Sequence, residues 1–264
     1  MLFSQSKKVL KNWLGPYWVF RAKELSRSLF GQKKEDPAFD LELYKSFIQK
    51  GDLCFDVGAN IGNKVDMLLA LGAEIVAIEP QPESYKILKH KYGNKVHLVR
   101  KGLGQEEEVK DFYISDGITI SSFSKEWIHS VQKTRFKNYN WNKIVKTEMT
   151  TLDKLIQQYG LPVFIKIDVE GYELEVLKGL SSPKKMISFE YTIPERTDQL
   201  HQCLNQIEKI NGNILCNYTK GESMKLILKK WMTLEEFRSY ISDDKVLGDN
   251  FGDIYIQSLP GSAT

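Results

Sequence analysis

The chain has 264 residues, of which 42% are hydrophobic and 27% are charged, and its formal net charge is +3. This composition excludes a disordered or collagen-like chain, and the length suits one large α/β domain. No run of about 18 apolar residues occurs, so we expect no membrane-spanning helix. The three cysteines and four histidines lack the spacing of a zinc site, and no signal peptide is evident. We therefore expect a cytoplasmic protein without a structural zinc site. We assign no metal ligands, because no spacing demands them, and a metal requirement stays open.

The first 34 residues are strongly basic, because eight Lys and Arg side chains accompany a single acid, Glu24. We expect residues 1–40 to form a basic helical extension that precedes a domain over residues 41–264. Such an extension could make weak contact with an anionic membrane surface or with nucleic acid. It could also pack on the domain through its aromatic residues. We favour packing, because basic surface charge alone is common.

Strand-like and helix-like segments alternate after this extension. Apolar residues at helical spacing first predict a helix that stops at Gly51. Short apolar runs then predict strands at 52–57, 74–80 and 95–100, and helical spacing predicts helices at 64–71 and 83–93. This alternation is typical of a parallel sheet with crossover helices on both faces.

The stretch 105–150 interrupts the alternation. It contains two strand-like segments with a helix-like segment between them, which predicts an insertion over the rim of the sheet, where binding loops tend to lie. The alternation then resumes, with expected helices at 151–160, 172–180 and 197–210 and expected strands at 163–169, 185–191, 213–218 and 252–257. Thr233 and Glu236 predict a capping box for one more short helix. We therefore expect one doubly wound, Rossmann-like α/β domain with a helical N-terminal extension.

The sequence FDVGANIG, from Phe55 to Gly62, is the strongest local motif. A strand ends, a turn of small residues follows, and a helix begins. Glycine allows the backbone to approach a ligand closely, and the amides at a helix N-terminus favour an anionic group. The alternative is a turn that only links strand and helix. We favour a ligand site, because the turn has more small residues than a simple connection requires.

Glu79 ends the second predicted strand, close to the glycine turn in a parallel sheet. An acid there is placed to accept hydrogen bonds from both ribose hydroxyls of an adenosine-containing ligand. A dinucleotide fingerprint needs glycines at positions 58, 60 and 63, but the chain has Gly58, Asn60 and Asn63. We therefore favour S-adenosylmethionine over a nicotinamide or flavin cofactor.

The sequence FIKIDVEGYE places Lys166, Asp168 and Glu170 in and just after a predicted buried strand. Residues at i and i+2 share a face of a strand, so Lys166 and Asp168 are candidates for an ion pair. Glu190 ends the neighbouring strand and should face the same crevice. One interpretation is an internal salt bridge. The other is a functional site, in which Asp168 lies beside the cofactor's ammonium and Glu170 or Lys166 lies near the substrate. Clustered carboxylates would then raise one another's pKa and supply a general base.

Together, FDVGANIG, IEPQPESY, TLDKL and IKIDVEGYELEVLKG resemble the FkbM-type family of S-adenosylmethionine-dependent methyltransferases, over about Asp52 to Glu190. The resemblance implies a class I methyltransferase sheet of seven strands with the last one antiparallel. It also implies that Glu79 holds the ribose and that Asp168 lies by the sulfonium. The remaining cofactor residues are then Asp56, Gly58, Ala59, Asn60 and Gly62 at the methionine end, Pro80 beside Glu79, and Gly102 and Leu103 at the adenine.

The resemblance also implies O-methylation, and we expect a hydroxyl of a sugar, glycan or small metabolite as the acceptor. Asp168 or Glu190 would take the proton, and Lys166 would tune their charge. His129 is a second candidate base if the insertion folds over the crevice. Alternatives are a nucleic-acid methyltransferase, which lacks support from an N-P-P-Y-type motif, and a fold that binds the cofactor without turnover. Tyr191, Trp127 and Trp141 could line the acceptor pocket or pack in the core. The sequence predicts no oligomeric state.

Overall fold

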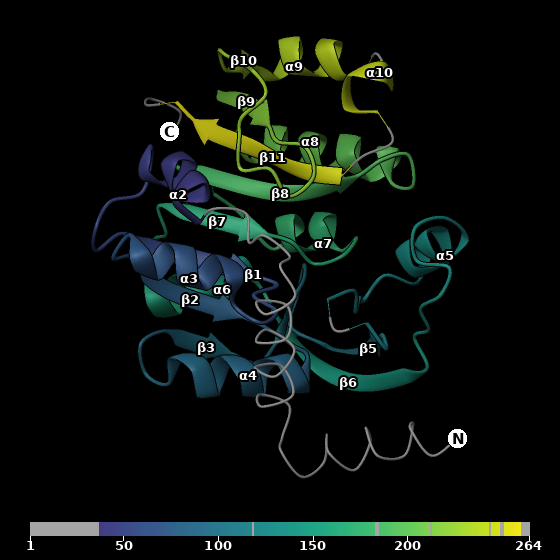
Figure 1. Cartoon of the computed structure of the whole chain (residues 1–264). Helices are drawn as coiled ribbons and strands as arrows, with labels where there is room; N and C mark the ends of the chain where they lie inside the picture. Colours follow the sequence, from purple (N-terminus) through teal and green to yellow (C-terminus); the bar gives the residue numbers. More distant parts are fainter. Residues whose placement is uncertain are drawn as a thin grey trace.

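A mainly parallel sheet forms the centre of the computed structural model, which describes residues 37–117, 119–182, 185–211, 213–242, 244–248 and 251–259. In this part of the chain the sheet has eight strands, in the order β10-β9-β11-β8-β7-β1-β2-β3 (Figure 1). Their bounds are β1 (Leu53–Val57), β2 (Glu74–Ile78), β3 (His97–Val99), β7 (Phe164–Ile167), β8 (Met186–Thr192), β9 (Ile214–Tyr218), β10 (Met232–Thr233) and β11 (Phe251–Ser258). β11 is antiparallel to both β8 and β9.

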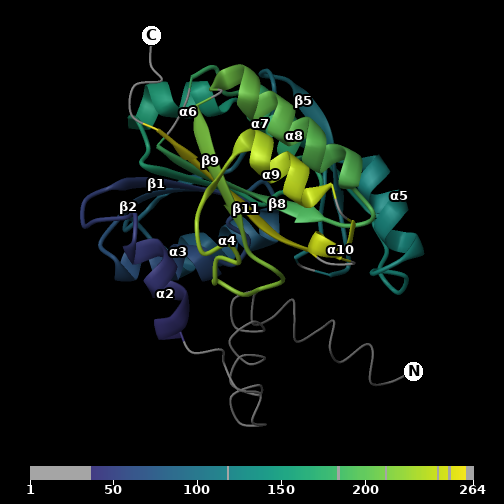
Figure 2. The same cartoon turned by 90° about the horizontal axis from the view of Figure 1, so that it is seen from above.

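Helices cover both faces of the sheet, as the view from above shows (Figure 2). One face carries α2 (Pro37–Lys45), α3 (Asn63–Ala70) and α4 (Pro82–Tyr92), and the other carries α6 (Leu152–Tyr159), α7 (Glu173–Lys178), α8 (Thr197–Ile210) and α9 (Leu234–Ile241). A short helix, α10 (Asp244–Leu247), follows α9. None of the described helices is both long and apolar enough to cross a lipid bilayer.

Successive strand residues point to opposite faces and so build two separate cores. In β1, Phe55 and Val57 pack on the side of α6 to α9, whereas Cys54 packs on the side of α2 to α4. All four residues of β7 are buried, which is the rule for a parallel strand covered on both sides. One of them is Lys166, so this central strand carries a charged group on the face of α2 to α4.

A smaller unit, here called the cap, lies beside the carboxyl ends of the parallel strands. In this part of the chain it has a three-stranded sheet, β4 (Gly102–Leu103), β6 (Lys143–Thr150) and β5 (Val109–Ile114), and the helix α5 (Lys125–Lys133). The Ser124 side chain accepts a hydrogen bond from the Trp127 N–H and so caps α5. The cap has its own apolar clusters, one of which is centred on Trp127 and Trp141.

The structure confirms the doubly wound α/β fold and the antiparallel last strand. It adds to the expected seven strands the short edge strand β10, and it makes a separate sheet of the cap strands. The capping box at Thr233 and Glu236 is present. Residues 1–36 lie outside the described residues, so the basic helical extension over 1–40 and its domain boundary stay predictions.

Packing of α2 on the sheet depends on Phe164, which is fully buried. Its ring centroid lies 5.4 Å from that of Tyr44 and 5.2 Å from that of Phe47. We expect Phe164→Ala to lower the free energy of unfolding by about 3–5 kcal/mol, because the truncation leaves a cavity. Urea unfolding measures this change. Leu161→Ala removes a side chain that is 68% exposed and should cost less than about 0.5 kcal/mol. Equal losses in the two variants would contradict this packing.

Candidate cofactor and active site

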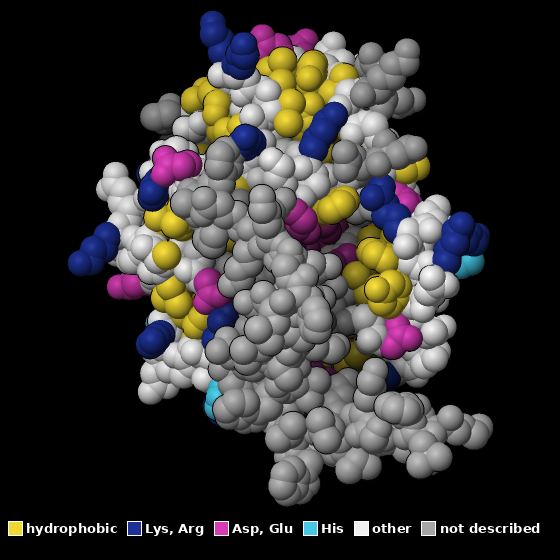
Figure 3. Space-filling view, viewed as in Figure 1, with side chains coloured by type: hydrophobic (Ala, Val, Ile, Leu, Met, Phe, Trp, Pro, Cys, Tyr) yellow, Lys and Arg dark blue, Asp and Glu magenta, His cyan; other side chains and the backbone are white. Residues whose placement is uncertain are grey.

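A cavity of about 910 Å³ lies between the carboxyl ends of the parallel strands and the cap. It is at the point where the strand order reverses, between β1 and β7, which is where ligands bind in open α/β sheets. Acidic side chains gather at the hollow in the middle of the face shown in Figure 3. The sequence-predicted residues that line the cavity are Asp56, Gly58, Ala59, Asn60, Glu79, Pro80, Gly102, Leu103, Trp127, Lys166, Asp168, Glu170 and Glu190.

The turn after β1 packs its backbone directly against the end of β7. Gly58 has φ 85°, and a Cβ at this position would overlap the Asp168 carbonyl oxygen. Asn60 also adopts a left-handed conformation, with φ 50°. The N–H groups of Gly58 and Ala59 both donate to the Ile78 carbonyl, each at 3.0 Å. The turn therefore needs a residue without a side chain at position 58, and it brings β1, β2 and β7 together at the cavity.

Glu79 holds two loops at the rim of the cavity. One carboxylate oxygen accepts from the Asn60 N–H and the other from the Gln81 N–H, each at 2.7 Å. The residue is 6% exposed, and this burial raises its pKa to about 7 even though the two N–H donors favour the charged form. Each oxygen can accept a further hydrogen bond, so Glu79 can bind a ligand hydroxyl as well.

A buried polar row crosses the floor of the cavity. Asp56, Lys166 and Ser188 are register neighbours on β1, β7 and β8. Asp56 is 1% exposed, and neither of its carboxylate oxygens has a hydrogen-bond partner among the described residues. The nearest cation is the Lys166 Nζ, at 4.0 Å. Burial raises the pKa of Asp56, and Lys166 only partly opposes this. A donor on a bound ligand could satisfy this carboxylate.

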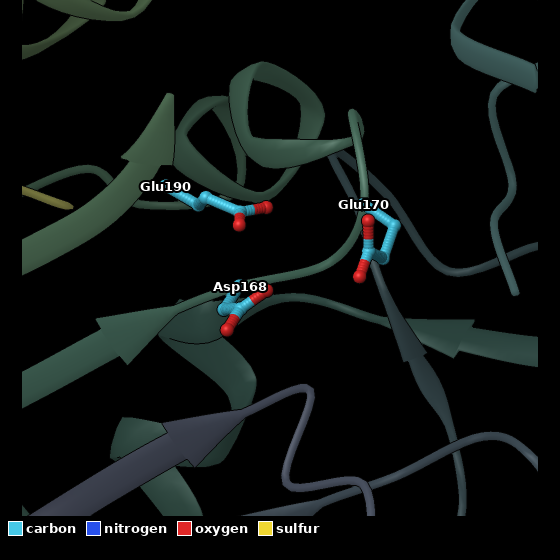
Figure 4. A group of neighbouring side chains, drawn as sticks. All are labelled: Asp168, Glu170 and Glu190. Atoms are coloured by element: carbon cyan, nitrogen blue, oxygen red, sulfur yellow. The ribbon is translucent and has the colours of Figure 1, made fainter. Parts of the chain in front are cut away.

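Three carboxylates lie close together at the carboxyl ends of β7 and β8, beyond this polar row. Each of Asp168, Glu170 and Glu190 offers one oxygen, and these oxygens lie within 4.8 Å of one another. Figure 4 shows the three side chains converging from the end of β7, from the loop after it and from β8. The Lys166 Nζ donates to Asp168 at 2.7 Å. Burial tends to lower the pKa of Lys166, but the attraction of Asp168 and Asp56 outweighs it and raises that pKa.

The remaining two carboxylates of the group have raised pKa values. Burial raises the pKa of Glu170, and the charges of Asp168 and Glu173 raise it further. Burial, followed by the charges of Asp168 and Glu170, likewise raises the pKa of Glu190. A carboxylate that holds its proton toward neutral pH is also a stronger base once ionised, so the cluster has the chemistry of a general base.

The cap holds the loop that carries Glu170. Glu170 has φ 56°, and its carbonyl accepts from the Ser122 hydroxyl of the cap at 2.6 Å. The Trp127 ring occupies the space that a Cβ at Gly171 would need. The Gly171 carbonyl accepts from the Gln199 side chain at 2.9 Å. Contacts from both sides therefore fix the conformation of this loop.

Four candidates from the sequence lie elsewhere. Gly62 does not line the cavity but precedes α3, where its carbonyl accepts from the Tyr92 hydroxyl at 2.6 Å. Tyr191 and Trp141 are buried and donate to the carbonyls of Thr219 and Ile120, so they favour the packing interpretation. The insertion does lie over the cavity, but His129 is exposed on α5 and lines a different, open hollow, so it does not face the cavity.

The sequence interpretation missed several cavity residues. Arg135 and Phe136 come from the cap, Glu222 from the loop after β9, and Thr192 and Phe251 from the facing ends of β8 and β11. The Arg135 guanidinium donates to the Glu195 carboxylate at 2.9 Å and to the Ile193 carbonyl, which ties the cap to the loop after β8. No local motif marks these residues, because segments far apart in the chain bring them together.

Comparisons with known proteins agree with this geometry. Residues 56–215 match the model of the methyltransferase FkbM domain. The hexuronic acid methyltransferase AglP of Haloferax volcanii is 25% identical over 144 residues, which are 53% of this chain and 55% of that protein. The match therefore spans little more than half the length of that relative.

Two solved structures have a similar architecture. The precorrin-6y C5,15-methyltransferase of Geobacter metallireducens is 11% identical with a TM-score of 0.43, covering 87% of this chain and 90% of its own. A TehB-like SAM-dependent methyltransferase of Corynebacterium glutamicum is 10% identical with a TM-score of 0.44, covering 92% and 96%. The family match, which spans more than half of the chain, carries the conclusion: this protein is a methyltransferase of the FkbM family.

Proposed function

We propose that the protein transfers the methyl group of S-adenosylmethionine to a hydroxyl of a sugar, a glycan or a small metabolite. The observation that carries the proposal is the cavity, which joins the turn at Gly58 and the Glu79 carboxylate to a group of three carboxylates. The family match supports methyl transfer, and the name of the Haloferax relative supports a sugar acceptor. Support for the sugar acceptor comes from this relative, which is 25% identical over 144 residues.

The cofactor half of the cavity fits an adenosyl amino acid. The turn at Gly58, Ala59 and Asn60 lines the cavity and can hold the methionine part, and the orphan Asp56 carboxylate can accept from its ammonium. Glu79 can accept from the ribose hydroxyls, with Pro80 beside it. Gly102 and Leu103, from the cap strand β4, then border the adenine.

The acceptor half can supply the base that a hydroxyl acceptor needs. When bound, the cofactor supplies an activated methyl group on a sulfonium. The protein has to align the acceptor with it, exclude water and remove one proton. We assign proton removal to Asp168 or Glu190, whose carboxylates face the cavity, and we assign to Lys166 the stabilisation of the charge on Asp168.

The nucleic-acid alternative depended on the basic residues 1–34, which lie outside the described residues. It makes a distinct prediction, because binding through phosphates weakens steeply as salt is added. A salt titration with tRNA and with DNA therefore separates it from a sugar-directed enzyme.

Calorimetry with S-adenosylmethionine and with NAD in parallel tests the cofactor. The experiment continues with transfer of radiolabelled methyl groups to methyl glucoside, methyl glucuronide and tRNA. We expect binding of S-adenosylmethionine alone and transfer to a glycoside. Binding of NAD instead, or transfer to tRNA alone, would reject the proposal, and cofactor binding without any transfer would support the degenerate alternative.

Glu79→Gln tests the ribose contact. We expect a loss of about 1.5–3 kcal/mol in binding of S-adenosylmethionine, or roughly 10- to 100-fold, because a charge-assisted acceptor is removed. In the wild type the affinity should rise with pH through about 7, as Glu79 ionises, and this rise should be smaller in the variant. Calorimetry from pH 6 to pH 8 measures both effects. Glu74→Gln, an exposed change at the start of β2, the strand that Glu79 follows, is the control and should bind normally.

Glu190→Gln and Asp168→Asn test the base. We expect kcat to fall about 10²- to 10⁴-fold in the variant that lacks the base. Because the raised pKa of Glu190 means that the base of the free protein ionises only as the pH rises, wild-type kcat/KM for S-adenosylmethionine should increase with pH over that ionisation. Steady-state kinetics on the acceptor found above measures this, and near wild-type turnover in both variants would show that the base is another group.

A further inference from the structure

We infer that Glu170 and Glu190 form a catalytic pair that shares one proton in the free protein and releases it when the sulfonium of the cofactor enters the cavity. This inference rests on the proposed function and adds Glu170 to the groups that touch the reactants. It assigns the ionisation of the base to the charge of the cofactor itself. The reaction would then begin from a base that forms only in the loaded site.

The contacts of Lys166 separate Asp168 from the pair. The Lys166 Nζ lies 2.7 Å from Asp168 and 4.0 Å from Asp56, so its single positive charge is divided between these two acids. Glu170 and Glu190 have no hydrogen-bond donor and no ion pair among the residues that the structure describes. Two carboxylates this close, without a cation of their own, cannot both be ionised at low cost, so they retain a proton between them.

The loop geometry directs Glu170 into the cavity. Its left-handed backbone is fixed by the Ser122 hydroxyl on one side and by the Trp127 ring against Gly171 on the other. Glu173, the next acid along the chain, has a different task, because its carboxylate accepts from the N–H groups of Val169 and Gly171. Glu173 thus holds the backbone of this loop in place, while the Glu170 side chain points toward Asp168 and Glu190 (Figure 4).

The charges around the pair are mostly negative. The groups that act on it come from β7, α7, β11 and the loop after β9, and they are Asp168, Lys166, Glu173, Asp253 and Glu222. Further cations line cavities with Glu190, and each has another partner. Lys64 donates to the Met224 sulfur at 3.1 Å, Arg196 lies 3.7 Å from the Asp198 carboxylate, and Arg135 lies 2.9 Å from that of Glu195. Since Lys166 is already shared by Asp56 and Asp168, a positive ligand charge is the change that favours a fully ionised pair.

Proton release and methyl transfer then follow in order. On binding, the shared proton passes to solvent and both carboxylates are ionised. On transfer, the acceptor oxygen forms a bond to the methyl carbon, the carbon–sulfur bond breaks, and its electron pair stays on sulfur, which becomes a neutral thioether. The hydroxyl proton passes to the pair. The pair thus holds one proton again, next to an uncharged product.

Calorimetry in two buffers of different ionisation enthalpy counts the protons released on binding, and it requires no acceptor. The two ligands are S-adenosylmethionine and S-adenosylhomocysteine, in the presence of EDTA. Glu79 contacts the ribose in both, so its titration contributes equally, and the difference between the ligands isolates the sulfonium. We expect the wild type to release more protons with S-adenosylmethionine, by up to one per site.

The variants Glu170→Gln and Glu190→Gln should each remove most of this difference, because a lone carboxylate has no partner with which to share a proton. Glu175→Gln on α7, whose carboxylate pairs with Lys178 outside the cavity, makes the same chemical change and should behave as the wild type.

Equal proton release with the two ligands in the wild type would overturn the inference, and this comparison depends on no variant. A difference that persists in both Gln variants would overturn it as well. If S-adenosylmethionine binds but the expected difference in proton release is not seen, the proposed function stands without the shared proton. If neither ligand binds, the proposed function itself fails and the inference falls with it.

Discussion

The single positive charge of Lys166 is the constraint on which the rest of the site depends. It is buried in the central strand between Asp56 and Asp168, where removal of any one partner would leave an uncompensated charge in the interior. Because Lys166 is paired with these two acids, Glu170 and Glu190 have no cation of their own in the described part of the chain. A cavity of this kind attracts a cationic ligand, and the methyl donor that we propose is a sulfonium.

The local sequence was sufficient to predict a site residue wherever one segment determines both its own conformation and its place in the sheet. The turn at Gly58, the acid at Glu79 and the alternation of Lys166 and Asp168 follow from short-range rules on glycine, strand ends and side-chain period. The structure places these residues together in the cavity, because parallel strands bring their carboxyl ends to one edge. The same rules gave the fold class and most of the helices and strands.

Residues whose role depends on distant segments could not be assigned in this way. Gly62 belongs to the same motif as Gly58, yet it packs against Tyr92 from α4 rather than facing the cavity. Arg135 and Glu222 reach the cavity from the cap and from the loop after β9, and no periodic pattern marks either of them. The orientation of His129 relative to the cavity could not be predicted either, because apolar spacing does not specify how an insertion folds on the sheet.

The contacts of the cap have a consequence for how acceptor choice can diverge in this family. Ser122 and Trp127 touch the loop of Glu170, and Arg135 touches the loop that follows Glu190, so the cap reaches both acids through backbone rather than through the cofactor turn. Mutations that reshape α5 and its flanking loops, rather than β4, would leave the turn at Gly58 and the proposed adenine border unchanged. In the proposed mechanism such mutations would also shift the carboxylates of Glu170 and Glu190, which accept the proton. A change in acceptor specificity would then be accompanied by a change in rate.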